Sequence, residues 1–192
     1  MIIGITGGTG AGKTTALDVL KSKGAVIIDC DKVYHELLES SEAMLGELHE
    51  SFPDAFIGGA FDRKKLGTIV FADADALNRL NVITNKYVTR RVSEIAANAE
   101  LAAVDAILLI ESGLADSCDY TVAVTAPKEL RIERIMQRDD VSREYAELRI
   151  NAQKSDDFYK SNCDYTLVND GDEGIFRLEC EKLFKTILGG KQ

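Results

Sequence analysis

The chain has 192 residues, a formal net charge of −9, and ordinary hydrophobic and charged fractions of 45% and 29%. This length suits one domain with room for an inserted subdomain, and the composition excludes a disordered chain. The acidic total argues against general binding to nucleic acid or anionic membranes, because both need a basic face. No apolar run approaches the roughly 20 residues that span a bilayer.

The first residues, MIIGITGG, lack the basic region and the layout of a signal peptide, so we expect a cytoplasmic protein. The cysteines are far apart and form no CxxC pair: Cys30, Cys118, Cys163 and Cys180. This spacing predicts reduced, mostly buried thiols rather than a metal site. We expect small-molecule substrates, neither nucleic acid nor membrane as a partner, and a monomer or small homo-oligomer.

Five short apolar runs have the character of buried strands: residues 2–6, 25–29, 104–111, 119–126 and 164–169. Helical patterns cover residues 14–23, 32–50, 62–102 and 173–188, and residues 56–62 are expected to form a loop. Strands that alternate with helices predict a parallel α/β sheet. The helical stretch between the second and third strands is too long for a plain crossover, so we interpret residues 32–102 as an inserted helical subdomain.

Residues 7–15, GGTGAGKTT, contain the G-x-x-x-x-G-K-[ST] pattern of a P-loop. The pattern follows an expected strand and opens an expected helix, which is the context that this motif requires. Glycines let backbone N–H groups turn toward phosphate oxygens, and the helix N-terminus adds partial positive charge. We therefore expect an ATP site, with Lys13 on the β- and γ-phosphates and the Thr14 hydroxyl on Mg²⁺. Further ATP contacts are expected from Gly8, Gly10, Ala11, Gly12 and Thr15.

A P-loop indicates a nucleotide site but does not determine the reaction. The chain has no DxxG pattern, and Asn85-Lys86-Tyr87-Val88 lacks the aspartate of NKxD, so a GTPase switch is disfavoured. A non-catalytic ATP-binding module remains possible, but it would not need the arginines that follow.

Those arginines lie within residues 130–153: Arg131, Arg134, Arg138, Arg143 and Arg149. Arg134 and Arg138 are four residues apart on one helix face, as expected for the mobile arginine lid of a small-molecule kinase. For Arg131 and Arg143 we favour a solvated helix with ion pairs at i,i+4 spacing.

Two carboxylates, Asp29 and Asp31, stand at the end of the second expected strand. Either could have a local role, Asp31 as the N-cap of the following helix and Asp29 as a strand-end residue bonded to the backbone. The P-loop amides, Lys13 and the lid arginines can supply the positive charge that phosphates need. Asp29 and Asp31 are therefore not needed at the ATP phosphates. They can face the second substrate of a kinase, the phosphate acceptor, whose hydroxyl must lose a proton.

In their order, these motifs resemble the dephospho-CoA kinase family over nearly the whole chain. The matching segments are TGG-x-x-x-GK[ST] at 6–14, D-x-D at 29–31, DAILLIESGL at 105–114, R-x-x-x-R-D at 134–139, R-I-x-x-Q at 149–153, and Asn169. Ile107 and Ile110 replace the proline and phenylalanine of the family's third-strand motif, and Asn85-Lys86 stands where His-Pro is common. The second departure lies in the region expected to receive the acceptor, so it bears on substrate contacts.

The resemblance implies a P-loop NTPase three-layer fold, in which helices flank a five-stranded parallel sheet, with a helical acceptor-binding insert and a helical lid. It divides one kinase domain, residues 1–192, into a nucleotide-binding core of 1–31 and 103–192, the insert of 32–102, and a lid of 134–154. The implied reaction is ATP-dependent phosphorylation of the ribose 3′-hydroxyl of dephospho-CoA, the final step of coenzyme A synthesis. A related kinase of a nucleoside, nucleotide or sugar is the alternative.

The same resemblance implies roles for individual residues. Lys13 and Arg138 would neutralise charge on the moving phosphoryl group, and Asp31 would orient the acceptor hydroxyl and accept its proton. Asn169 and Gly171 would lie near the adenine of ATP. Our candidates for acceptor contacts are Asp31, Arg63, Glu111 and the Arg90–Arg91 pair, although Glu111 and these arginines could equally be surface residues.

Overall fold

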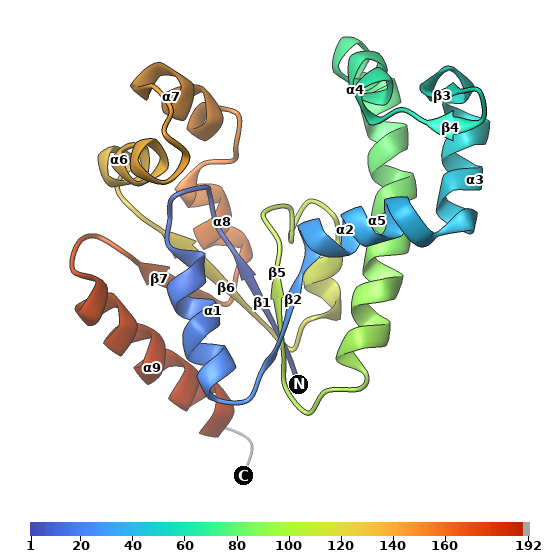
Figure 1. The fold of residues 1–192 in the computed structure, drawn as a ribbon. Helices are drawn as coiled ribbons and strands as arrows, with labels where there is room; N and C mark the ends of the chain where they lie inside the picture. The colour runs from blue at the N-terminus through green and yellow to red at the C-terminus, as the bar shows by residue number, and fades with distance from the viewer. Residues whose placement is uncertain (190–192) are drawn as a thin grey trace. The chain divides into compact units, whose positions relative to one another are not determined.

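The computed structural model describes residues 1–189 and divides this part of the chain into two compact units, traced in Figure 1. Unit 1 comprises Met1–Ile28 and the chain from Ala96 onward, and unit 2 comprises Asp29–Ile95. Each unit has a hydrophobic core of its own. Within the described residues, no helix has both the length and the apolar character needed to cross a bilayer.

Unit 1 is built on a five-stranded parallel sheet in the order β2-β5-β1-β6-β7. The strands are β1 (Ile2–Thr6), β2 (Val26–Asp29), β5 (Ala102–Asp105), β6 (Tyr120–Thr125) and β7 (Tyr165–Val168). The central strand β1 pairs Ile3 with Ala103 of β5 on one side and with Tyr120 of β6 on the other. These strands are short apolar runs because both faces of a parallel sheet are covered.

Helices flank this sheet: α1 (Lys13–Ser22), α6 (Lys128–Asp139), α7 (Arg143–Asn151), α8 (Asp156–Asn162) and α9 (Glu173–Gly189), with a short 3₁₀ helix η2 (Leu114–Ser117). Helices α1 and α9 lie side by side, as Figure 1 shows. Leu20 of α1 and Phe176 and Phe184 of α9 share one core with Ile3 and Val122 of the strands. The predicted parallel α/β fold with five strands is therefore confirmed.

Helices α6 and α7 form a small layer of their own within unit 1. Their contact is apolar, made by Ile132 and Ile135 from α6 and by Ala146 and Ile150 from α7. Ser142 caps α7 by accepting a hydrogen bond from the backbone N–H of Tyr145. This helix pair covers most of the segment expected to form a lid.

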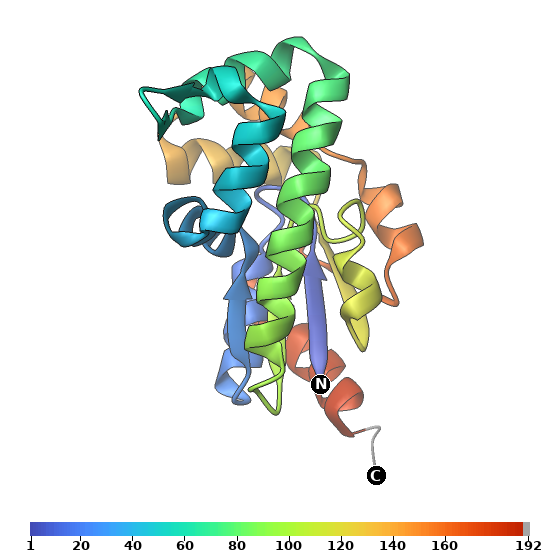
Figure 2. The same cartoon turned by 90° about the vertical axis from the view of Figure 1, so that its right-hand side faces the viewer.

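Unit 2 is mainly helical and consists of α2 (Cys30–Ser40), α3 (Glu42–Ser51), α4 (Arg63–Ala72) and nearly all of α5 (Ala74–Ala96), with a 3₁₀ turn η1 (Pro53–Ala55) and the short strands β3 (Phe56–Ile57) and β4 (Ala60–Phe61). Its core includes Met44, Leu48, Phe52, Leu66 and Ile83. Figure 2 shows α3 and α5 side by side, and the Tyr87 hydroxyl of α5 donates a hydrogen bond to the Ala43 carbonyl of α3.

The prediction of a loop over residues 56–62 is wrong. Strands β3 and β4 pair there in antiparallel register, with Phe56 opposite Phe61. Gly58 and Gly59 connect them with φ of +59° and +85°, which is the left-handed backbone that two-residue hairpin turns require. The Gly-Gly pair between two apolar residues was a hairpin signal that the sequence reading did not use.

The third strand is also shorter than predicted. It covers Ala102–Asp105, and residues 107–111 form turns. Leu109 is buried there, and a Cβ added at Gly4 would lie 2.7 Å from its side chain, so Leu109 packs against the central strand. The apolar run is thus buried as a turn rather than as a strand, a distinction that periodicity alone does not make. The helical pattern expected to reach residue 102 ends at Ala96.

All four cysteines are free thiols, as predicted, but only Cys180 is buried and the other three are partly exposed. Cys180 lies on α9 in the core of unit 1, where burial raises the pKa of its thiol to about 12. The expectation of mostly buried thiols was therefore wrong for three of them.

Candidate active site

The P-loop of residues 7–12 connects β1 to α1 at the carboxyl end of the central strand. Gly10 and Gly12 have φ of +80° and +99°, a left-handed backbone that glycine adopts without strain. A Cβ at Gly12 would also lie 2.1 Å from Nδ2 of Asn169. No side chain caps α1, so no side-chain acceptor occupies the N-terminus of this helix, where an anion site would lie.

Lys13 is the first residue of α1 and folds back over the loop. Its Nζ donates a hydrogen bond to the Gly7 carbonyl at 3.0 Å and lies 4.0 Å from Oδ1 of Asp105. Asp105 ends β5, the strand beside β1, so both side chains stand at the same edge of the sheet. Asp105 was not predicted as a site residue; in the sequence it was only the first residue of the motif at 105–114. The meeting of carboxyl ends in a parallel sheet was the signal that could have identified it.

Thr14 follows Lys13 and is exposed. Among the described residues, His, Cys, Asp and Glu side chains nowhere gather in threes that could hold a metal ion. A divalent cation here would therefore take few protein ligands, which fits Mg²⁺, since it keeps several waters and binds substrate phosphates. Thr14 and Asp105 are two of the oxygen donors at this end of the sheet.

Arg134 and Asn169 contact each other and bind backbone carbonyls of the P-loop. Arg134 donates to the Gly10 carbonyl at 3.3 Å and to Oδ1 of Asn169 at 3.0 Å. Asn169, 5% exposed, donates through Nδ2 to the Ala11 carbonyl at 3.0 Å. Both ends of the Asn169 amide are thus engaged by protein groups. Gly171 is exposed, with open space around its Cα.

Arg131 contradicts its predicted place on a solvated helix face. It is 4% exposed and donates hydrogen bonds to the Thr9 carbonyl, to Asp156 and to Gln153. Arg131 precedes Arg134 by three residues, so the two share one face of α6, and this spacing was the available signal. Arg143 agrees with its prediction, because it is exposed and pairs with Glu129 and Glu147.

Arg138 lies at the end of α6 and is bound to a carboxylate. Its Nε and Nη2 donate to the two oxygens of Asp139 at 2.7 and 2.9 Å, and Arg149 of α7 also donates to Asp139. Hydrogen bonds from Arg138 and then Arg149 hold the pKa of Asp139 well below its usual range, although partial burial opposes them. The side chain of Arg138 remains 59% exposed, so a phosphate could replace Asp139 as its partner.

In unit 2, Asp29 rather than Asp31 is the N-cap of α2. Oδ1 of Asp29 accepts hydrogen bonds from the backbone N–H groups of Asp31 and Lys32 at 3.0 and 3.1 Å. The capping alternative for Asp31 is therefore wrong, whereas the alternative that Asp29 bonds to the backbone is confirmed. Asp31 is exposed in the first turn of the helix.

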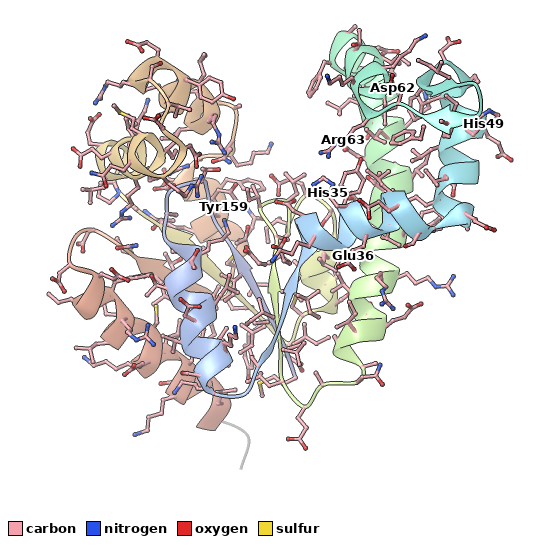
Figure 3. All side chains as sticks on the ribbon, in the orientation of Figure 1. His35, Glu36, His49, Asp62, Arg63 and Tyr159 are labelled. Atoms are coloured by element: carbon pink, nitrogen blue, oxygen red, sulfur yellow. The ribbon has the colours of Figure 1, made fainter. Side chains whose placement is uncertain are left out.

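The candidates for acceptor contacts have different surroundings. Arg63 begins α4, and Figure 3 shows it beside His35 of α2, with Nη1 3.3 Å from Nδ1 of His35. A guanidinium group can only donate, so Nδ1 of His35 is the acceptor in this contact. Arg90 and Arg91 both pair with Glu94 one turn further along α5.

Two other positions noted in the sequence are now located. Glu111 is exposed in the turns after β5, and its charge adds to the burial that raises the pKa of Tyr159 to about 12. Lys86, which stands in place of the histidine or proline common in the family, pairs with Glu47 of α3. The Tyr87 hydroxyl donates to the same carboxylate at 3.0 Å, so this departure forms a link between two helices of unit 2.

Comparison of the sequence with protein families finds that residues 1–174 match the model of the family described as "Dephospho-CoA kinase". The chain is 35% identical over 176 residues to a dephospho-CoA kinase of Thermobifida fusca, covering 89% of this chain and 88% of the relative. It is 34% identical over 197 residues to a dephospho-CoA kinase of Anaeromyxobacter dehalogenans, covering 99% and 93%.

Solved structures agree. A Thermus thermophilus protein superposes with a TM-score of 0.80 at 32% identity, covering 100% of this chain and 98% of the other. A dephospho-CoA kinase from Campylobacter jejuni gives 0.69 at 28% identity, with the same coverage. A shikimate kinase from Acinetobacter baumannii, at 0.55 and 19% identity over 99% and 94% of the chains, shares the fold alone. By its sequence and its fold, this chain belongs to the dephospho-CoA kinase family.

Proposed function

We propose that this protein transfers the γ-phosphoryl group of ATP to the ribose 3′-hydroxyl of dephospho-CoA, giving coenzyme A and ADP in the final step of coenzyme A synthesis. The observation that carries the proposal is a P-loop with Lys13 at an uncapped helix N-terminus, in a chain whose residues 1–174 match the kinase family. A small-molecule biosynthetic reaction of this kind fits a cytoplasmic monomer or small homo-oligomer.

The phosphates of ATP bind along residues 7–15 in this proposal, through Gly8, Gly10, Ala11, Gly12, Lys13, Thr14 and Thr15. Thr14 would hold Mg²⁺, with Asp105 as a further oxygen donor, and the ion would supply positive charge to the phosphates of the nucleotide. Lys13 leaves the Gly7 carbonyl, to which it is bonded here, and neutralises charge on the moving group. Asn169 and Gly171 border the adenine.

Asp31 is the proposed general base. The backbone N–H groups at the start of α2 are satisfied by Asp29, so the carboxylate of Asp31 is not needed as the cap. Asp31 is exposed and lies two residues beyond the end of β2. A carboxylate there can orient the acceptor hydroxyl and take its proton as the new P–O bond forms.

Arg138 is the proposed lid residue that stabilises the transferring group. Its bidentate pairing with Asp139 has the same geometry that an arginine uses to bind phosphate oxygens. Exchange of Asp139 for a phosphate therefore preserves the hydrogen bonds of the guanidinium group. Asp139 keeps its second partner, Arg149, so its charge remains balanced when Arg138 departs.

Arg63 is the preferred contact for the acceptor's phosphate groups. It is exposed at the start of α4, and its Nη1 lies 3.3 Å from Nδ1 of His35. Arg90 is a weaker candidate because Glu94 already balances its charge, and Glu111 remains a candidate for acceptor contact. In this proposal unit 2, which carries Asp31, Arg63 and Arg90, is the acceptor-binding insert, and Glu111 is a candidate from unit 1.

A coupled assay of ADP release over a panel of acceptors tests the proposal. Dephospho-CoA should accelerate ADP release, whereas adenosine, nucleoside monophosphates and simple sugars should leave it near the background rate. Clear activity on one of those hydroxyls without acceleration by dephospho-CoA would assign the protein to a different kinase activity. ATP binding without turnover on any acceptor would indicate a regulatory ATP-binding module.

A further inference from the structure

Every backbone carbonyl of the P-loop accepts a hydrogen bond from the protein. Gly7 O accepts from Lys13 Nζ, Gly8 O from Ala11 N, Thr9 O from Arg131 Nε, Gly10 O from Arg134 Nη1, Ala11 O from Asn169 Nδ2, and Gly12 O from Thr15 N. Side chains from outside the loop supply the three central donors. The carbonyls of Thr9, Gly10 and Ala11 are thus each held by a different residue.

This arrangement has a direct electrostatic consequence. A loop binds phosphate when its N–H dipoles point inward, and a carbonyl turned inward would repel the same anion. Holding three successive carbonyl oxygens on arginine and asparagine side chains prevents that rotation. The donors behind the loop therefore keep it in an anion-binding conformation.

The contacts at Thr9 form the most extensive part of this support. Arg131 donates to the Thr9 carbonyl at 2.9 Å, to Asp156 at 3.2 Å and to Oε1 of Gln153 at 3.1 Å. Gln153 in turn accepts from the Thr9 backbone N–H at 2.9 Å and donates to the Thr9 hydroxyl at 2.7 Å. Three polar groups of one P-loop residue are therefore bound by two side chains.

Arg131 lies three residues before the expected lid of 134–154 and Gln153 lies near its end, and we call these two ends the base of the lid. Arg131 lies on α6, and Gln153 follows the end of α7 by two residues, with its backbone N–H bonded to the Ile150 carbonyl. Ile150 belongs to the apolar contact that joins α7 to α6. The tip of the P-loop and the base of the lid are thus one hydrogen-bonded and packed assembly.

We propose that Arg131 and Gln153 are positioning residues that clamp Thr9 and so set the affinity of the P-loop for the phosphates of the nucleotide. The inference rests on the proposed ATP site. Neither side chain needs to touch ATP, because both act through the backbone conformation of residues 8–11. Arg131 and Gln153 were not among the site residues predicted from the sequence. There, Arg131 was expected on the surface, and Gln153 was only one position of a motif.

The test compares Gln153→Met with Gln137→Met, a control in the same lid segment that changes an exposed glutamine of α6. Calorimetry measures the dissociation constants of ATP, inorganic tripolyphosphate and adenosine for the full chain. Gln153→Met should weaken ATP and tripolyphosphate by about tenfold or more, the effect of losing hydrogen bonds to a charged partner. Adenosine affinity should stay unchanged, and Gln137→Met should match the wild type for all three.

Steady-state kinetics supply a second readout. The KM for ATP should rise while the KM for dephospho-CoA stays within about twofold, since the clamp acts on one substrate only. Arg131→Lys is the second variant if Gln153→Met does not fold. It keeps a cation beside Asp156 but lacks the planar fork that also reaches Thr9 and Gln153, so it should weaken ATP and tripolyphosphate in the same way.

A lower melting temperature with unchanged ATP and tripolyphosphate affinities in both variants would overturn the clamp and leave these residues a purely structural role. Equal weakening of adenosine and ATP would also overturn it. A failure of the proposed function can be distinguished from a failure of the clamp. In the first case the wild-type protein itself would show no ATP binding or no transfer to dephospho-CoA.

Discussion

The P-loop of unit 1 and the acceptor candidates of unit 2 are built in opposite ways. The P-loop works through backbone groups, and buried side chains such as Arg131 and Asn169 hold its carbonyls in place. In unit 2, Asp31 and Arg63 are exposed side chains on the first turns of helices. A site for the constant phosphates of a nucleotide can be rigid, whereas a site for a particular acceptor depends on individual side chains.

The largest expected effect is on the P-loop side. Lys13→Met should lower kcat/KM by a factor on the order of 10³, because it removes a positive charge aimed at the transferring group. Steady-state assays measure the loss, and an unchanged melting temperature shows that the fold is intact. Activity within tenfold of the wild type would remove Lys13 from the catalytic set.

Asp31→Asn tests the proposed general base among the acceptor candidates of unit 2. Turnover should fall by about 10² or more, as for loss of a general base, while the dissociation constant of ATP stays unchanged. Asp29→Asn is the matched control, because asparagine also caps helices well and should retain most of the activity. If Asp29→Asn proved the more damaging change, the base would have to be reassigned to Asp29.

Arg63→Gln and Arg90→Gln separate the two arginine candidates in unit 2. Arg63→Gln should raise the KM for dephospho-CoA about tenfold, since a charge-assisted hydrogen bond to phosphate is lost. Arg90→Gln should raise it less, because Arg90 is already paired with Glu94. The KM for ATP serves as the internal reference, and the reverse order of effects would contradict the assignment.

Two glycines of unit 2 test whether the turn between β3 and β4 requires a glycine with positive φ. Gly59→Ala should destabilise the protein by about 1 kcal/mol, because its φ of +85° is strained for alanine. Gly46→Ala, within α3 and with open space around it, should stabilise by about 0.5–1 kcal/mol. Urea unfolding measures both, and equal shifts in one direction would argue against the hairpin turn.

The smallest expected effect concerns Asp139, at the end of α6 beside α7. Asp139→Asn should lower the melting temperature by a few degrees at pH 7. The pKa of Asp139 is depressed in the folded protein relative to about 3.9 in the unfolded chain. Its stabilisation is therefore present above about pH 5 and is lost as the pH falls toward the folded-state pKa.

Thermal melts at about pH 7, 4 and 3 should show the gap between Asp139→Asn and the wild type narrowing as the pH falls below about 4. Asp157→Asn is the control, because this carboxylate is almost fully exposed and only distantly paired with Lys160. Its effect should stay within about 1 °C at every pH. A gap that does not depend on pH would mean that the charge of Asp139 is not what stabilises the lid.

Local sequence patterns were enough to predict the fold class and the family of this protein. The P-loop spacing, the apolar runs of the strands and the ordered motifs predicted the parallel fold and the family, because each depends on residues that are close in sequence. The Gly58-Gly59 hairpin was also readable from local sequence, although it was predicted as a loop. These features need only backbone geometry and periodicity.

Only the tertiary structure decided which polar residues meet. Arg131 and Arg143 both lie near the start of a helix with acidic residues close in sequence, yet Arg131 is buried against Thr9 and Arg143 pairs on the surface. Asp29 and Asp31 are two residues apart, and the direction of the chain entering α2 made Asp29 the cap. Such partners come from distant parts of the chain or from the exact path of a turn, and neither is encoded in spacing alone.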